Sequence, residues 1–468
     1  MYDGREAFRM EPSPGMTTPD GIMNRFLRTF SDVRPGESRN ALLLALNIFL
    51  ILTAYYVLKP VREALILKEG SAELKSYLSA GQVVLLAFII PLYGRLVARV
   101  SRRRLVNIVT AIFAACLLVF YALARLGTRL DIPFFLWIGI FNMMIVAQFW
   151  GFANDIYSKD EGERLFPIVG FGASIGAVFG SRLAARLIAP FGIYELMLLG
   201  CVLLVLQAAV TNLVDRDVAE KRQRTAVSAA AVGPAPGKPV SPGFNAFTLV
   251  FSKPYLLSMG LMLLLLNWVN SMGEYILGNA IRSAAEAAVA AGEAGVLSVE
   301  QVIGQAYAQY FSLTNICGVL LQLFVVSRMV KHLGVPRCVT VLPCISLVSY
   351  NVLAFYPVIG VMVAAKVAEN STDYSLNNTV RNMLFLPCSR EEKYSAKQVI
   401  DSFFVRVGDV LSAVLVFVGT TYLKLNASGF AMANATLVLG WLVLAIRVGQ
   451  RYSALTSMQY LTKVGDTE

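Results

Sequence analysis

The sequence contains twelve apolar runs, and each is about long enough to cross a lipid bilayer as one helix. A helix needs roughly 20 residues to span about 30 Å of hydrocarbon. The runs begin near residues 40, 76, 105, 133, 165, 192, 255, 304, 336, 358, 396 and 428. Charged residues are only 15% of the 468-residue chain, against about 25% in ordinary globular proteins. These features predict an all-α membrane protein with twelve transmembrane helices.

The positive charge lies in the segments between apolar runs. The formal net charge is +11, and the densest cluster is GRLVARVSRRR at residues 94–104, with further Lys and Arg at residues 215–253. Cytoplasmic loops of membrane proteins carry such an excess. We therefore expect a multi-pass protein of the inner (plasma) membrane with both termini cytoplasmic. The bilayer is the expected large partner, no nucleic acid is needed to explain the charge, and the chain is expected to act as a monomer.

One polar segment divides the apolar runs into two groups of six. Residues 215–244 are first charged and then rich in Ala, Gly, Pro and Ser, which is typical of a linker. We predict a cytoplasmic tail at residues 1–39, a six-helix half at 40–213, a cytoplasmic linker at 214–254, a second half at 255–450 and a cytoplasmic tail at 451–468. PLYGRLVARV (91–100) aligns with FVVSRMVKHL (324–333), and SKDEGE (158–163) with SREEKY (389–394). Two pseudo-symmetric halves of this kind are the architecture of major facilitator transporters.

Polarity recurs with a period of three helices, as expected if the first, fourth, seventh and tenth line a central cavity. The third, sixth, ninth and twelfth runs, at residues 105–124, 196–210, 339–356 and 430–446, contain no charged residue. Charged and amide side chains gather instead in the first, fourth, seventh and tenth runs. A charge at the bilayer centre costs roughly 2.5–3.5 kcal/mol, so these side chains need a watery cavity or a bound partner.

Helical spacing places the polar side chains of each cavity helix on one face. Two cations and one acid on the first helix favour an anionic ligand. Pro60 predicts a kink there; in the alternative, the membrane ends at Leu58 and the charges only sit at the interface. The predicted substrate-binding residues are Tyr55, Lys59, Arg62, Glu63, Asn270, Glu274, Lys366, Asn370, Asp373, Tyr374, Asn377 and Arg381. Candidates for coupling or gating are Asp155, Glu369, Arg406 and Asp409, although Asp155 as a helix-end residue and Arg406 with Asp409 as an ion pair also fit structural roles.

Motifs of soluble enzymes are missing or misplaced. GASIG (172–176) matches G-x-S-x-G, but it lies inside an apolar run, and the only histidine, His332, lies in a basic loop. The glycines at 170, 172, 176 and 180 instead predict close helix packing. There is no P-loop sequence. We predict no enzymatic activity, no cofactor and no metal site.

Three stretches resemble a known family. They are AYYVLKPVREAL, QFWGFANDIYSKDEGERLFPIVGFGASIGAVFGS and DYSLNNTVRNMLFLPCSREEKYSAKQVIDSFFVRVGD. They are similar to the ATP/ADP translocases of obligate intracellular bacteria and plastids, a branch of the major facilitator superfamily, over residues 40 to 450. The resemblance implies nucleotide exchange or import. It places family cations at Arg62 and Arg381, a family acid at Asn270 or one turn later at Glu274, and a family lysine at Asp409, so the chain resembles a divergent member.

These observations predict a secondary active transporter of an anionic metabolite, with ATP/ADP-type nucleotide exchange by alternating access as the first choice. The runner-up is a proton-coupled carrier of another organic anion, a carboxylate or a siderophore-like chelate. A third hypothesis is a non-transporting membrane receptor or scaffold. It requires a soluble partner-binding domain, and the predicted tail and linker are too short and too polar to form a core.

Overall fold

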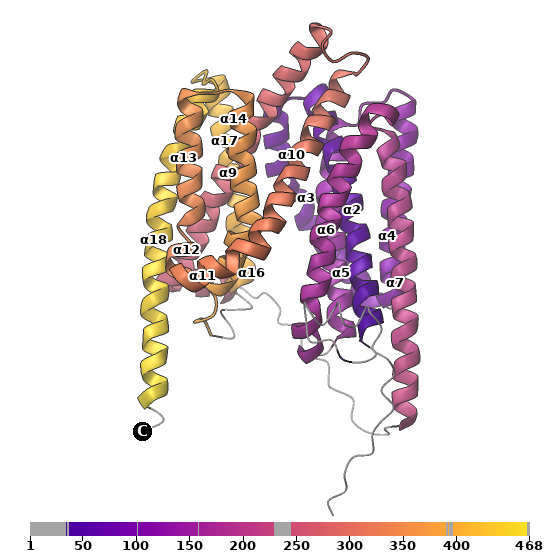
Figure 1. The fold of residues 1–468 in the computed structure, drawn as a ribbon, viewed down its shortest axis with the longest axis vertical. Coiled ribbons are helices and arrows are strands. Elements are labelled where there is room, and N and C mark those ends of the chain that lie inside the picture. Colours follow the sequence, from indigo (N-terminus) through magenta and orange to yellow (C-terminus); the bar gives the residue numbers. More distant parts are fainter. Residues whose placement is uncertain are drawn as a thin grey trace, which may run out of the picture.

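The protein forms two helical bundles that stand side by side (Figure 1). A computed structural model describes residue 34 and residues 37–100, 102–157, 159–228, 245–389, 392 and 396–465. Within these residues there is no β-strand. The first 33 residues of the predicted N-terminal tail and residues 229–244 of the predicted linker lie outside the described part.

The first bundle contains six long helices. They are α2 (Ser38–Glu69), α3 (Ala72–Arg99), α4 (Arg102–Arg125), α5 (Asp131–Ile156), α6 (Lys159–Phe191) and α7 (Glu195–Ser228). The predicted linker begins at residue 214, but α7 continues for four further turns. The sequence EKRQRTAVS there consists mostly of residues that tolerate or favour a helix, which explains the extension.

The second bundle repeats the plan with more interruptions. The short α8 (Asn245–Ser252) lies within the predicted linker and precedes α9 (Pro254–Ala290). Three helices contain π-helical segments. The remaining elements are α10 (Val299–Leu321), η1 (Gln322–Val326), α11 (Ser327–Leu333), α12 (Val335–Cys338), α13 (Val341–Phe355), α14 (Ile359–Thr372), η2 (Asp373–Asn377), α15 (Asn378–Met383), α16 (Lys397–Val399), η4 (Ile400–Phe404), α17 (Val405–Thr421) and α18 (Ala427–Gly465). α18 remains helical where a tail from residue 451 is predicted.

Ten helices in the described part are long and apolar enough to cross a membrane. α3 and the combined segment α14–η2–α15 bring the number of spanning segments to twelve, six in each half. The predicted all-α fold with twelve membrane-spanning segments in two six-helix halves is therefore confirmed. Within the apolar runs of α4, α7, α13 and α18, exposed side chains such as Ile112, Val205, Val348 and Leu439 are apolar. This fits helices whose outer faces contact lipid.

A line of glycines brings the backbones of α6 and α2 into direct contact. A Cβ atom added to Gly172, Gly176 or Gly180 would lie 2.4 Å, 2.5 Å or 2.6 Å from the carbonyl oxygen of Ala45, Phe49 or Thr53. Only glycine fits at these three positions, which confirms the predicted close packing for them. Gly170 is different, since a Cβ there would meet nothing within 4 Å.

We expect Gly176→Ala to destabilise the protein by roughly 1–3 kcal/mol, because overpacking forces the two helices apart. Chemical unfolding of the purified protein in detergent micelles measures the difference. Gly170→Ala on the same helix is the matched control and should unfold like the wild type. Equal unfolding of the two variants would contradict the backbone contact.

At the linker end of each bundle, an ion pair joins the residue that precedes one helix to a residue in or before another helix. Arg164 of α6 donates two hydrogen bonds of 2.8 Å to the carboxylate of Glu37, which immediately precedes α2. In the second half, Lys253 before α9 pairs with Glu392 before α16. The hydrogen bonds from Arg164 lower the pKa of Glu37 from 4.5 to about 2, against the opposing effect of burial.

The Glu37 pair predicts a defined pH dependence of stability. A carboxylate whose pKa is lowered on folding stabilises the folded state above its unfolded pKa, and this contribution is lost as the pH falls through its folded pKa. The difference in thermal midpoint between wild type and Glu37→Gln should therefore be full above about pH 4.5 and shrink toward pH 2. A difference that is unchanged at pH 2.5 would contradict this assignment.

The two halves contact each other at the end remote from the linker. Lys68 Nζ of α2 lies 3.0 Å from Glu300 of α10, and the Tyr275 hydroxyl of α9 donates a 3.0 Å hydrogen bond to Glu73 of α3. Arg282 of α9 donates to the carbonyl of Gly70 at 2.8 Å. Toward the linker end the two bundles diverge (Figure 1). The arrangement is therefore closed at the remote end.

Candidate functional site

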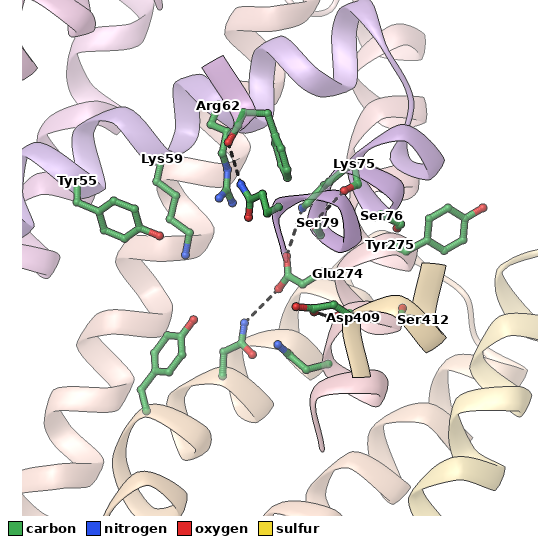
Figure 2. Close-up of a pocket in the computed structure, with 16 residues that line it drawn as sticks. Tyr55, Lys59, Arg62, Lys75, Ser76, Ser79, Glu274, Tyr275, Asp409 and Ser412 are labelled. Atoms are coloured by element: carbon green, nitrogen blue, oxygen red, sulfur yellow. Dashed lines mark hydrogen bonds and ion pairs between the residues drawn. The ribbon is translucent and has the colours of Figure 1, made fainter. Parts of the chain in front are cut away.

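A polar cavity of about 220 Å³ lies between the two halves. It is lined by side chains from α2, α3, α5, α9, α14, η2 and α17 (Figure 2). Two of the four predicted cavity helices, α2 and α9, supply most of the charged lining, while α5 contributes only an aromatic ring. The lining residues are Tyr55, Lys59, Arg62, Lys75, Ser76, Ser79, Gln82, Phe135, Asn270, Ser271, Glu274, Tyr275, Asn370, Tyr374, Asp409 and Ser412.

One face of α2 forms a wall of the cavity. Tyr55, Lys59 and Arg62 are four and three residues apart, so they share a face, and all three line the cavity. α2 continues as a single helix through Pro60 to Glu69, and the residues beyond Leu58 on its other faces are buried in the protein. The charged stretch is therefore inside the packed helix bundle, which favours the cavity interpretation over an interfacial one.

A chain of alternating charges connects the halves. Arg62 is ion-paired with Glu63, and Lys75 Nζ of α3 lies 2.7 Å from the same carboxylate. Lys75 Nζ also lies 3.5 Å from Glu274 of α9, in the other half. Because Glu63 is completely buried, it stands behind the cavity wall and orients the two cations rather than facing a ligand.

Lys366 of α14 extends this series of ion pairs behind the cavity. Its side chain is buried, and Nζ lies 2.8 Å from Asn270 Oδ1 and 3.1 Å from Glu369. A weaker approach of 3.9 Å joins Lys366 to Glu274. Lys366 does not line the cavity. A substrate would reach it only after Asn270 moves.

Glu274 is the acid on which the polar contacts of the cavity converge. It lies near both Lys75 and Lys366, and it accepts hydrogen bonds of 3.2 Å from Asn370 and from Tyr310 of α10. Figure 2 shows its side chain in the middle of the site, with dashed contacts running to two different elements. Protonation of this one carboxylate would therefore weaken the hold on two lysines from opposite halves.

Lys59 differs from the other cations of the cavity. Arg62 and Lys75 are ion-paired, whereas no acidic side chain in the described part of the chain lies within 4 Å of Lys59 Nζ. Its ammonium instead lies over the Phe311 ring, 3.9 Å from the centroid, and the side chain lines the cavity (Figure 2). Among the described residues, Lys59 is thus a cavity cation with no carboxylate within ion-pairing distance.

The π-helix η2 separates the predicted residues of the tenth helix. Asn370 and Tyr374 line the cavity, whereas Asp373 borders a small separate pocket and accepts a 2.7 Å hydrogen bond from Asn377. Arg381 lies 4.0 Å from Asp401 and does not line the cavity. A π-turn inserts an extra residue, so the simple spacing of three and four no longer keeps these side chains on one face.

The remaining candidates have structural partners or lie elsewhere. Asp409 lines the cavity but is held by Asn267 at 2.7 Å, Ser271 at 2.8 Å and Arg406 at 3.2 Å. The predicted ion pair between Arg406 and Asp409 is therefore confirmed. Asp155 is exposed near the end of α5 and does not line the cavity.

Our sequence interpretation missed the contribution of α3. Lys75, Ser79 and Gln82 of this helix line the cavity together with Ser76. Their spacing of four and three equals that of Tyr55, Lys59 and Arg62 on α2. This repeated spacing is the signal that could have found them, but the predicted second run begins only at residue 76.

Comparisons with known proteins agree with this architecture. The family model described as Major Facilitator Superfamily matches residues 44–383, which is more than half of the chain. A search among curated proteins found no match.

Solved structures share the fold at low sequence identity. The chain is similar to the nucleoside transporter NupG, at 11% identity and a TM-score of 0.59, over 89% of this chain and 99% of that one. A bacterial homologue of the iron transporter ferroportin is 14% identical with a TM-score of 0.60, over 89% of this chain and 98% of that one. A POT family transporter in complex with 5-aminolevulinic acid is 11% identical with a TM-score of 0.61, over 91% of this chain and 99% of that one. With the family match, the twelve spanning segments and the central polar cavity, the chain belongs to the Major Facilitator Superfamily.

Proposed function

We propose that this protein is a secondary active transporter that moves an anionic metabolite by alternating access, with a nucleotide exchanged in the ATP/ADP manner as its substrate. The observation that carries the proposal is Lys59, a cation that lines the cavity without an acidic partner among the described residues. An unbalanced charge in a membrane protein favours a ligand of opposite sign. A phosphate or carboxylate group at Lys59 supplies that charge.

The surroundings of Lys59 suit a ligand with an anionic end and a planar end. Arg62 lies one turn away on the same face, and its guanidinium forms planar, bidentate contacts with phosphate or carboxylate groups. Tyr55, Phe135 and Tyr374 line the same cavity. Their rings offer stacking surfaces for a nucleobase. The sequence resemblance to the nucleotide translocases supports the same substrate class.

Binding of an anion also has a mechanical consequence in this proposal. Lys75 joins Glu63 in its own half to Glu274 in the other half. A phosphate group close to Lys75 competes with Glu274 for the ammonium, and this loosens a contact that holds the halves together. The loaded and empty carriers then differ in their freedom to change conformation, as alternating access requires.

Exchange in proteoliposomes tests the proposal. Purified protein is reconstituted into vesicles, and uptake of labelled ATP is measured under three conditions. The vesicles contain ADP, contain buffer only, or contain buffer with a pH gradient imposed across the membrane. We expect ATP uptake that requires internal ADP. Failure of every nucleoside phosphate to enter or to be exchanged would overturn the nucleotide assignment. Lack of uptake for every organic anion would overturn the transport proposal itself.

The second candidate is a proton-coupled carrier of another organic anion, and Glu274 favours it. Its carboxylate lies near both Lys75 and Lys366, so one proton on Glu274 would weaken the hold on two cations. This alternative predicts uptake driven by a pH gradient alone. In that case Glu274→Gln abolishes the pH dependence but keeps downhill counterflow.

A further inference from the structure

A second, apolar groove lies outside the central site, between α3, α4 and α5 of the first half. Its volume is about 530 Å³. Near the start of α3, Tyr77 makes a ring contact with Phe417 of α17 in the other half, at 6.4 Å between centroids. Farther along the same helix, its side chains border the groove. The lining residues are Ile89, Leu92, Tyr93, Arg99, Val109, Ile112, Phe113, Ile140 and Met144.

The groove is open at the surface of the protein. Leu92 is 65% exposed and Ile112 is 53% exposed, and both line it. These side chains belong to helices that span the bilayer, where exposed apolar surface contacts hydrocarbon. An opening of this size among apolar walls holds no favourable site for water, because water needs polar partners. Hydrocarbon chains are therefore the matching occupants.

The polar end of the groove is positively charged. Arg99, the last residue of α3, is the only charged residue among the described residues that line the groove. Arg103 and Arg104 are exposed in the first turn of α4, and Arg103 donates a 2.9 Å hydrogen bond to Asn212. The N-terminus of α4 adds the positive end of its helix dipole. Arg99 and the helix dipole favour an anionic group at this end of the groove.

The length of the groove fits one leaflet of the membrane. Ile89 and Arg99 are ten residues apart on one helix, which corresponds to about 15 Å. This is about half of the ~30 Å hydrocarbon core, the depth that one acyl chain of one leaflet reaches. The arginines then lie at the height of the lipid phosphates.

We propose that this groove binds an anionic phospholipid, with one acyl chain between α3, α4 and α5 and the headgroup phosphate at Arg99. The lipid contacts α3, the helix that also carries Lys75, Ser76, Ser79 and Gln82 to the central cavity. It thereby packs against a helix that forms part of the cavity wall. The proposal does not depend on the identity of the transported substrate.

Native mass spectrometry of the purified full-length protein tests lipid binding directly. The protein is titrated with phosphatidylglycerol and with phosphatidylcholine of the same acyl chains. One cation near a membrane surface contributes about 1 kcal/mol to binding an anionic lipid, which corresponds to about a fivefold change in affinity. We expect phosphatidylglycerol to bind at least about fivefold more tightly, and Arg99→Gln to remove this preference while binding of phosphatidylcholine stays unchanged.

Two further variants separate the chain from the headgroup. Ile112→Trp or Leu92→Trp fills the groove and should weaken binding of both lipids, and both substitutions are on exposed, lipid-facing positions that tolerate a large apolar side chain. Arg337→Gln removes an exposed arginine of the other half and is the control that should bind both lipids like the wild type. The proposal is overturned if the wild type binds the two lipids equally, if Arg337→Gln acts like Arg99→Gln, or if millimolar inorganic phosphate displaces the lipid.

Discussion

Proteoliposomes containing Lys59→Gln are expected to take up the anionic substrate with an apparent affinity roughly tenfold to a hundredfold lower than the wild type. A hydrogen bond to a charged group contributes about 1.5–3 kcal/mol, which corresponds to this range. No acidic side chain in the described part of the chain is ion-paired with Lys59, so the substitution leaves no described carboxylate without its partner and the fold should remain intact. The measurement is the concentration dependence of labelled substrate uptake, with thermal stability recorded in parallel.

Two controls make this result specific to the site. Lys59→Arg keeps the positive charge over the Phe311 ring and should retain most of the affinity. Lys331→Gln removes an exposed lysine of α11, outside the cavity, and should transport like the wild type. Unchanged uptake by Lys59→Gln, or an equal loss in Lys331→Gln, would contradict the role of Lys59.

Glu369→Gln is expected to be the most destabilising of the charge substitutions, by about 3–5 kcal/mol, because it removes the nearest acidic partner of a buried lysine. Lys366 Nζ lies 3.1 Å from Glu369, and Tyr350 donates a 3.0 Å hydrogen bond to the same carboxylate. Glu274, at 3.9 Å, is the only other acid within ion-pairing distance of Lys366 among the described residues. Chemical unfolding in detergent micelles measures the loss.

The double variant Lys366→Met/Glu369→Gln shows whether the loss comes from the unpaired charge. Removal of both charges leaves no buried ion without a partner, so the double variant should be more stable than Glu369→Gln alone. If Lys366 instead serves mainly to bind substrate, Lys366→Met by itself will abolish uptake without altering stability. A double variant that is less stable than either single one would contradict the pairing.

The fold was largely predictable because the bilayer imposes a simple length rule. Runs of about 20 apolar residues indicated twelve helices, and the break after residue 214 indicated two halves. Helix ends were less predictable, since nothing in the rule says where a helix stops outside the membrane. α7 and α18 therefore continue as helices into segments for which a linker and a tail are predicted.

The site was predictable where the helix is regular and less so where it is not. On α2 the spacing of Tyr55, Lys59 and Arg62 correctly places all three on the cavity wall. In the segment α14–η2–α15, the π-helix η2 shifts the following side chains to a different face of the helix. No local sequence signal indicates a π-turn. Lys75 was missed for another reason: at the start of α3 it resembles an ordinary loop charge, and only the packing of α3 against α9 and α2 brings it to Glu63 and Glu274.

The glycine contacts between α2 and α6 also limit how the cavity can adapt. One carbonyl from each of three successive turns of α2 lies against α6 with no side chain between the backbones. Such a pair cannot slide or rotate about its long axis without a steric clash, so it must move as one rod. The height of Lys59 in the membrane is then tied to that of α6. A larger or smaller ligand must be accommodated by side-chain rotation or by tilting of the whole rod.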